Sequence, residues 1–239
     1  MHQGSAARPW QQIPIQDCGE ALIPLPPVLL RCTPHPYAAL GAPYGPDQTP
    51  FALRQGVVER LLQAQATLQT AHPGYRLAIF DGWRPVAVQA FMVGHTIQQR
   101  CLQQGVDPTI PSSELTRITG EVGRFWAPPS ADPATPPPHS TGGAVDLTLV
   151  DASGLPLPMG GEIDAIGPVS EPDHYAVCAA AEPDAEEARW HRHRQMLNWA
   201  MTAAGFARHP NEWWHFSVGD QLWAWISQAP LARYGRVDP

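Results

Sequence analysis

The sequence predicts a single α+β domain in which an antiparallel sheet is flanked by helices. Its 239 residues are enough to bury one sizeable core. Helical and strand patterns mix along the chain without the regular strand–helix alternation of a parallel α/β fold, and the sequence contains no internal repeat. We expect residues 1–48 to form an N-terminal Pro-rich segment packed on a core of residues 49–239, as one domain overall.

The first elements follow from the spacing of apolar and turn residues. Residues 1–48 are rich in proline and predict loops and short strands, for example from Leu22 to Leu25. From Phe51 onward, apolar residues recur every three to four positions, which predicts an amphipathic helix. Pro73-Gly74 ends that helix.

A buried strand and a second helix come next. Residues 75–80 form a short apolar run that predicts the strand, and residues 86–104 predict the helix. Residues 106–138 include a Pro-dense stretch, which is typically stiff and extended. We expect this stretch to form an ordered wall leading into the segment that follows.

The second half of the chain adds two strands and a long helix. Residues 144–150 alternate in apolar character and predict a strand, and residues 183–204 predict a helix stopped by a glycine. Residues 213–218 predict another strand, since aromatic residues favour this conformation. Residues 222–226 predict a short terminal element.

Composition excludes several classes of function. The chain has 15 Lys plus Arg against 22 Asp plus Glu, a net charge of -7, and no basic block, so we expect no nucleic-acid partner. No apolar run approaches the roughly 20 residues of a membrane span. The start shows no signal-peptide pattern. We therefore expect a cytoplasmic protein, although a periplasmic location stays open if a signal peptide was removed.

The four cysteines form no CxxC pair and stand apart from the His and Asp motifs. Buried or idle thiols are the simplest interpretation, because free cysteines tend to be buried. A disulfide between Cys18 and Cys32 stays open for an exported protein.

Two short segments carry the strongest chemical signal: residues 139–146, His-Ser-Thr-Gly-Gly-Ala-Val-Asp, and residues 212–215, Glu-Trp-Trp-His. Together they supply two imidazoles and two carboxylates. A catalytic zinc site needs three protein ligands and an open position. His139, Asp146 and His215 fill the three positions, which leaves Glu212 as a proton carrier. Alternatively, the two tryptophans are core residues and the polar groups lie at its rim.

The spacing sets conditions on this site. Six residues separate His139 from Asp146, which is wrong for one helical face but suits a loop followed by a strand. Gly142 and Gly143 would let the backbone turn back, since glycine tolerates positive φ. Residues three apart on a strand face opposite sides. Glu212 and His215 therefore meet only if Glu212 precedes the strand, where the chain bends.

A third segment, Asp81-Gly82-Trp83-Arg84-Pro85, follows the strand predicted at residues 75–80. An arginine at a strand end can stabilise a developing oxyanion or grip a carboxylate. The alternative is a structural ion pair between Arg84 and Asp81. Other histidines, among them His35 and His209, have no partners at ligand spacing.

In order and spacing, the segments DGWRP, HSTGGAVDLTL and EWWHF resemble the D-alanyl-D-alanine dipeptidases of the VanX type. These belong to the zinc DD-peptidase group that shares its fold with the Hedgehog signalling domain. The similarity runs from about residue 37 to residue 216. It implies that His139, Asp146 and His215 bind one Zn²⁺ per chain. It further implies that Glu212 is the catalytic base and that Arg84 stabilises the transition state.

The chain departs from the family where the substrate is held. Pro137 stands two residues before the zinc histidine, where the family often has serine. Residues 158–164 resemble the family pattern M-G-T-x-F-D, with Gly161 and Ile163 replacing Thr and Phe. The resemblance implies that Asp164 pairs with the substrate ammonium, with Glu162 as the alternative.

Four residues are expected around the substrate: Asp164, Asp81, Ser140 and Tyr37. Asp81 is also expected to support Arg84 from behind, and Tyr44 is an alternative to Tyr37.

The resemblance implies a zinc-dependent dipeptidase that hydrolyses D-Ala-D-Ala through a zinc-activated water. Its partner would be a small dipeptide, and neither a nucleic acid nor a membrane. Two alternatives stay open: a zinc DD-carboxypeptidase or endopeptidase acting on cell-wall peptides, and a non-catalytic zinc-binding module of the Hedgehog type. The sequence does not indicate the oligomeric state, the preferred dipeptide or the physiological role.

Overall fold

The computed structural model describes residues 8–46 and 48–238. Its centre is a five-stranded sheet in the order β2-β4-β5-β7-β6. The strands are β2 (Leu30–Arg31), β4 (Arg76–Asp81), β5 (Ala144–Val150), β6 (Ala207–Arg208) and β7 (His215–Ser217). All neighbouring pairs are antiparallel except β2 and β4, which are parallel. The predicted α+β class is confirmed, with one parallel strand at the sheet edge.

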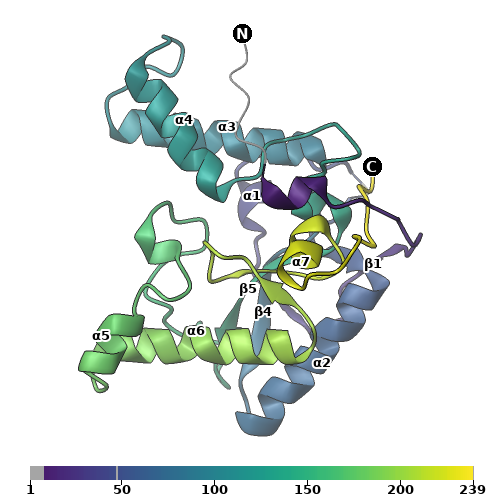
Figure 1. Cartoon of the computed structure of the whole chain (residues 1–239). Coiled ribbons are helices and arrows are strands. Elements are labelled where there is room, and N and C mark those ends of the chain that lie inside the picture. Colours follow the sequence, from purple (N-terminus) through teal and green to yellow (C-terminus); the bar gives the residue numbers. More distant parts are fainter. Residues whose placement is uncertain (1–7, 47, 239) are drawn as a thin grey trace.

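Helices lie on both sides of the sheet (Figure 1). On one side are the two long helices α2 (Gln55–Ala71) and α6 (Glu186–Ala203). Toward the other end of the molecule lie α3 (Val86–Gln103) and α4 (Ser113–Phe125), which pack on each other. The shorter helices are α1 (Pro36–Ala39), α5 (Ala176–Ala181) and α7 (Gln221–Ile226), with 3-10 turns η1 (Pro9–Gln12), η2 (Pro138–Thr141) and η3 (Pro168–Ser170).

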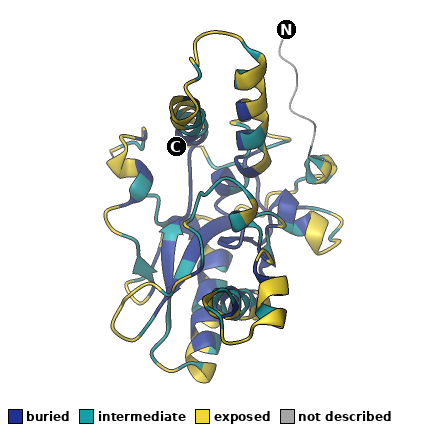
Figure 2. Cartoon of the chain, turned by 90° about the vertical axis from the view of Figure 1, so that its left-hand side faces the viewer, coloured by how far each residue is buried: buried dark blue, intermediate teal, exposed yellow. Residues whose placement is uncertain are grey.

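The main core fills the space between the sheet and helices α2 and α6. On β5, Val145, Leu147 and Leu149 are fully buried and belong to this core. Leu61 of α2 and Leu197 of α6 pack into the same cluster. Because side chains alternate along a strand, the residues between them face away from this core. Figure 2 shows the buried strands enclosed by helices whose outer surfaces are exposed. One face of β5 is therefore free to carry chemistry.

Most predicted elements are present, with two differences. The helix predicted from Phe51 begins at Gln55, because residues Ala52–Arg54 form strand β3 and pair with β1 (Leu22–Pro24). The stretch 106–138 is not extended throughout, since α4 occupies residues Ser113–Phe125. Ser112 caps this helix by accepting a hydrogen bond from the Leu115 backbone N–H at 3.1 Å.

The N-terminal segment contributes to both sheets. It supplies β1 to the two-stranded sheet and β2 to the edge of the large sheet. Its η1 turn packs on α7, where Gln221 donates a hydrogen bond to the Ile13 carbonyl at 2.7 Å. All four cysteines are free, so Cys18 and Cys32 form no disulfide. Among the described helices, none combines the length and apolar character needed to cross a membrane.

Candidate zinc centre

The register between β5 and β7 brings two predicted ligands together. Asp146 pairs directly with His215, and their neighbours Val145 and Phe216 pair toward the core. Residues directly opposite on antiparallel strands project to the same face. His215 Nδ1 therefore lies 3.1 Å from Asp146 Oδ1. Both side chains are at least nine-tenths buried.

The third predicted ligand, His139, comes from the η2 turn just before β5. Gly142 ends this turn with φ of 70°, and a Cβ there would collide with a Leu22 methyl group. Gly143 follows closely against the Val218 carbonyl, where a Cβ would lie at 2.8 Å. These two glycines allow the turn that directs His139 onto the β5 face, as the sequence predicts.

The three side chains form a triangle of ligand atoms. His139 Nε2 lies 3.2 Å from His215 Nδ1 and 3.1 Å from Asp146 Oδ2. His139 Nδ1 donates to the Gly82 carbonyl at 2.7 Å, so Nε2 presents its lone pair. Ligands at about 2.0–2.1 Å from a tetrahedral zinc lie about 3.3 Å apart. Both the donor set and the spacing therefore fit zinc, and among described residues this is the one His/Cys/Asp/Glu group identified as able to hold a metal.

Glu212 directly precedes the bend at residues 213–214 that leads into β7, in keeping with the expectation that it lies before the strand. Its Oε2 is 3.7 Å from His215 Nδ1. Burial, together with the nearby Asp146 and Asp164 carboxylates, raises the pKa of Glu212 well above its ordinary value. Trp213 and Trp214 both pack in the main core, and Trp214 also lines the pocket. The arrangement suits a carboxylate that accepts and returns a proton close to a metal ligand.

A β-bulge delivers Asp81 to the same face of the sheet. Leu77 and Ile79 point into the core, and the register shifts between Ile79 and Asp81, so that Asp81 lies opposite Asp146. An extra residue in one strand redirects the side chain that follows it. Without this shift, Asp81 would share the core-facing side of Ile79.

Asp81 holds Arg84 in place. Arg84 Nε and Nη2 donate to Asp81 Oδ2 at 3.0 and 2.7 Å, and His35 Nε2 lies 3.0 Å from Asp81 Oδ1. Burial raises the pKa of the Asp81 carboxyl, but the Arg84 and His35 interactions outweigh it, so the pKa lies below its ordinary value. The ion pair that sequence reasoning left as an alternative is thus present, and Arg84 also lines the pocket.

Arg84 also reaches the ligand triangle, which is the set of ligand atoms of His139, Asp146 and His215. Nη2 lies 3.4 Å from Asp146 Oδ2, and Nη1 donates to Gln89 Oε1 at 2.8 Å. The guanidinium carbon lies 4.9 Å from the Tyr37 ring centroid and 5.1 Å from that of Trp126. This packing fixes a permanently charged group beside the site where an oxyanion would form.

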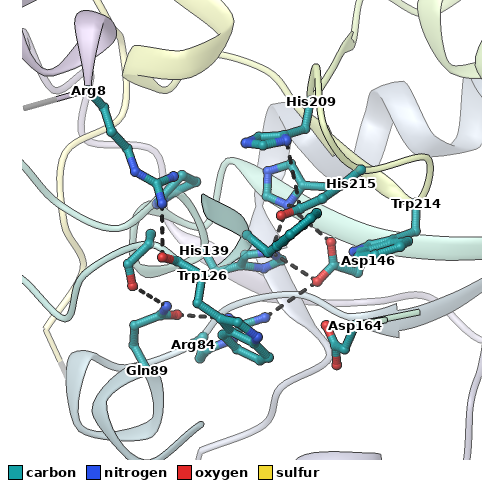
Figure 3. A pocket seen from close by; sticks show the side chains of 14 residues that line it. Arg8, Arg84, Gln89, Trp126, His139, Asp146, Asp164, His209, Trp214 and His215 are labelled. Atoms are coloured by element: carbon teal, nitrogen blue, oxygen red, sulfur yellow. Dashed lines mark hydrogen bonds and ion pairs between the residues drawn. The ribbon is translucent and has the colours of Figure 1, made fainter. Parts of the chain in front are cut away.

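Asp164 lies on the opposite side of the ligand triangle from Arg8 (Figure 3). Its backbone has φ of 66°, unusual for a residue other than glycine, and its Oδ2 accepts a hydrogen bond from the Tyr37 hydroxyl at 2.8 Å. Burial, followed by the Asp146 charge, raises the pKa of Asp164 to about 7. Asp164 lines the pocket, as expected for a group that meets the substrate.

Of the four residues expected around the substrate, Asp164 lines the pocket, whereas Asp81, Ser140 and Tyr37 do not. Asp81 is fully buried behind Arg84 and is not part of the pocket lining. Ser140 is also fully buried, and its Oγ donates to the Arg84 carbonyl at 2.8 Å. Both residues hold Arg84 in this structure, and their predicted contact with substrate stays a prediction. Tyr37 and Tyr44 do not line the pocket either, and they reach Asp164 and Asp81 respectively.

Sequence reasoning missed several residues that shape the site. His209 stacks edge-on against His215, with ring centroids 5.4 Å apart, and Arg8 lines the pocket from the N-terminal segment. Arg194 of α6 is buried and donates to three carbonyls around the Asp164 segment, those of Met159, Val169 and Glu171. Arg8 and Arg194 have no neighbour at motif spacing, so only the fold brings them to the site. His209 lies three residues before Glu212, with its Nδ1 4.0 Å from Glu212 Oε2.

Comparisons with known proteins place the chain in a family. A family model described as D-Ala-D-Ala dipeptidase matches residues 31–232. A D-alanyl-D-alanine dipeptidase of Synechocystis sp. is 44% identical over 97% of both chains. One from Escherichia coli is 32% identical over 61% of this chain and 56% of its own length. A solved zinc complex of a vancomycin-resistance D,D-pentapeptidase aligns over 93% of this chain and 96% of its own, at 14% identity and a TM-score of 0.44.

Proposed function

Because this chain belongs to the D-Ala-D-Ala dipeptidase family, we propose that it hydrolyses free D-alanyl-D-alanine at the site formed by His139, Asp146 and His215. The observation that carries this proposal is the spacing of four side chains. His139 Nε2 and His215 Nδ1 lie 3.2 Å apart, each lies 3.1 Å from one of the two Asp146 carboxylate oxygens, and Glu212 Oε2 lies 3.7 Å from His215 Nδ1.

His139, Asp146 and His215 would hold one zinc ion, which when bound supplies Lewis acidity and lowers the pKa of water toward neutrality. The hydrogen bond from His139 Nδ1 to Gly82 fixes the tautomer and the orientation of this ligand. The pairing of Asp146 and His215 across two strands holds the other two ligands on a rigid sheet.

Glu212 acts as the proton carrier. It takes a proton from the attacking water and delivers it to the leaving amine, two roles that need a pKa near the working pH. The direction of its pKa shift supports this assignment, because burial and neighbouring carboxylates favour the protonated form.

Arg84 stabilises the charge that develops on the carbonyl oxygen. Asp81 and Gln89 hold its guanidinium, so little reorganisation accompanies the reaction. Asp164, with the Tyr37 hydroxyl behind it, is placed to receive the ammonium group of the substrate.

The test compares free D-Ala-D-Ala with a cell-wall pentapeptide ending in the same two residues, using D-alanine release as the readout. We expect rapid hydrolysis of the dipeptide, loss of activity with a chelator, and recovery when zinc is returned. Preference for the pentapeptide would identify a carboxypeptidase. Stoichiometric zinc without hydrolysis of either substrate would identify a non-catalytic module.

A further inference from the structure

A second arginine reaches the pocket from outside the part of the chain that the family model covers. Arg8 precedes residues 31–232, yet it lines the same pocket as Arg84, Glu212 and His215. Figure 3 shows its side chain directed from the N-terminal segment toward the ligand triangle.

The position of Arg8 is fixed by contacts on two sides. Its Nη2 donates to the carbonyls of Gly123 and Trp126, at 2.8 and 2.9 Å, at the end of α4. The next residue but one, Trp10, packs edge-on against His209 and tilts against Trp225 of α7. The guanidinium is therefore held by the end of α4 and by the Trp10 ring, whose centroid lies 5.4 Å from its central carbon.

The two arginines of the pocket differ in how their charge is balanced. Arg84 contacts the carboxylates of both Asp81 and Asp146. Arg8 forms no ion pair with any acidic residue in the described ranges 8–46 and 48–238, and its side-chain bonds there go to carbonyls through Nη2 alone. Burial lowers the pKa of Arg8, and the Glu212 carboxylate, which forms no ion pair with it, offsets this only in part, so the guanidinium is costly to keep. Its remaining donors suit an anion that arrives with the substrate.

The arrangement of charges in the pocket matches a zwitterion. Asp164 and Arg8 lie on opposite sides of the ligand triangle. A free dipeptide carries an ammonium group at one end and a carboxylate at the other, with its single peptide bond between them. With the ammonium at Asp164 and the peptide carbonyl at the triangle, the carboxylate is directed toward Arg8.

We propose that Arg8 binds the C-terminal carboxylate of the dipeptide and thereby selects substrates in which this carboxylate is only one residue beyond the cleaved bond. This inference rests on the proposed function, since it assigns one end of the same substrate. Arg8 is on this view a specificity-determining residue supplied by the N-terminal segment.

The experiment measures kcat/KM of the zinc-loaded enzyme on D-Ala-D-Ala and on its C-terminal amide, which has the same cleaved bond but no carboxylate. We expect wild type to prefer the acid by about 10- to 100-fold, the value of a hydrogen-bonded charge pair. Arg8→Met should lose this factor on the acid, mainly through KM, and remain within about twofold of wild type on the amide. Arg124→Met removes an exposed arginine of the same α4 segment and should leave both values unchanged.

Two outcomes would overturn the assignment of Arg8. If Arg8→Met lowers hydrolysis of acid and amide equally, the residue only holds the α4 segment or tunes Glu212. If wild type hydrolyses acid and amide equally well, no carboxylate recognition exists, and this result needs no variant. Both outcomes leave the proposed function intact. Failure of wild type to hydrolyse either compound would instead remove the dipeptidase proposal itself.

Discussion

Asp146 and His215 face each other across the β5–β7 pair, with His215 Nδ1 3.1 Å from Asp146 Oδ1. The backbone ladder that fixes this pair also directs Val145 and Phe216 into the core on the opposite face. A slip of one residue would exchange the two sets, burying the polar pair among leucines. The stability of the sheet and the geometry of the site thus depend on the same register.

The first prediction concerns metal binding. His139→Ala removes one corner of the ligand triangle, and we expect the purified protein to lose stoichiometric zinc. Elemental analysis after dialysis against a metal-free buffer measures the effect. His174→Ala, at an exposed histidine outside the pocket, is the matched control and should keep the wild-type zinc content. Full zinc content in His139→Ala would show that the ligand set is wrong.

The second prediction separates metal binding from proton transfer. Glu212→Gln keeps the shape of the side chain but cannot accept the proton. We expect unchanged zinc content and a loss of kcat of about 10²–10⁴-fold, the usual contribution of a positioned general base. Steady-state kinetics and metal analysis on one preparation test both points. A variant that keeps a tenth or more of the wild-type kcat would exclude Glu212 as the base.

Local patterns predicted the elements of this fold better than their arrangement. The strand at Ala144–Val150 was predicted with its observed limits, because its alternation is a local property. Three other features depend on residues far apart in the sequence: the pairing of this strand with β7, the parallel pairing of β2 with β4, and the bulge in β4 before Asp81. The bulge matters most, since simple alternation would turn Asp81 away from Arg84 and the site.

The missed features divide into two kinds. Helix α4 carried a readable signal, a Ser112 cap with Leu115, Ile118 and Val122 at helical spacing, which the surrounding prolines obscured. Arg8 and Arg194 carried none. Each acts through contacts with distant backbone carbonyls, which no short motif encodes. Short motifs were enough to predict the metal ligands and the base, whereas the placing of Arg8 in the pocket could be seen only in the fold.

A third prediction concerns the shape of the Arg84 guanidinium. Arg84→Lys keeps a positive charge for Asp81 but cannot also reach Gln89 and the pocket in the same planar geometry. We expect kcat to fall by about 10²–10³-fold, as when an oxyanion donor is removed, with a smaller change in KM. Zinc content should stay at the wild-type value. A change confined to KM would assign Arg84 to substrate binding instead.

The fourth prediction tests how the Asp164 segment is held. Arg194→Met leaves the carbonyls of Met159, Val169 and Glu171 without their donor. The Met159 carbonyl, whose bond to Arg194 is buried, costs about 1–3 kcal/mol when left unpaired, and the two partly buried carbonyls cost less, so the melting temperature should fall. Because this segment carries Asp164, KM should rise while zinc content stays unchanged. Arg189→Met, at an exposed position of the same helix, serves as the control. An unaltered KM in a destabilised Arg194→Met protein would separate Arg194 from the substrate site.

The last prediction concerns the pH dependence of stability in chelator-treated protein. The pKa of Asp164 is raised from its ordinary value of 3.8 to about 7, first by burial and then by Asp146. Between these pH values the folded state binds a proton that the unfolded state has released. The contribution of Asp164 therefore stabilises the fold at low pH and is lost as pH rises toward 7.

Asp164→Asn removes this titration and keeps an acceptor for the Tyr37 hydroxyl. Relative to wild type, the variant should gain up to about 1.4 kcal/mol of unfolding free energy for each pH unit between roughly 4 and 7, and no more above that range. Urea unfolding at a series of pH values measures the difference. Asp184→Asn, an exposed control, should follow wild type throughout. If Asp164→Asn also follows wild type, the carboxyl titrates in its ordinary range and is not held in a raised-pKa environment.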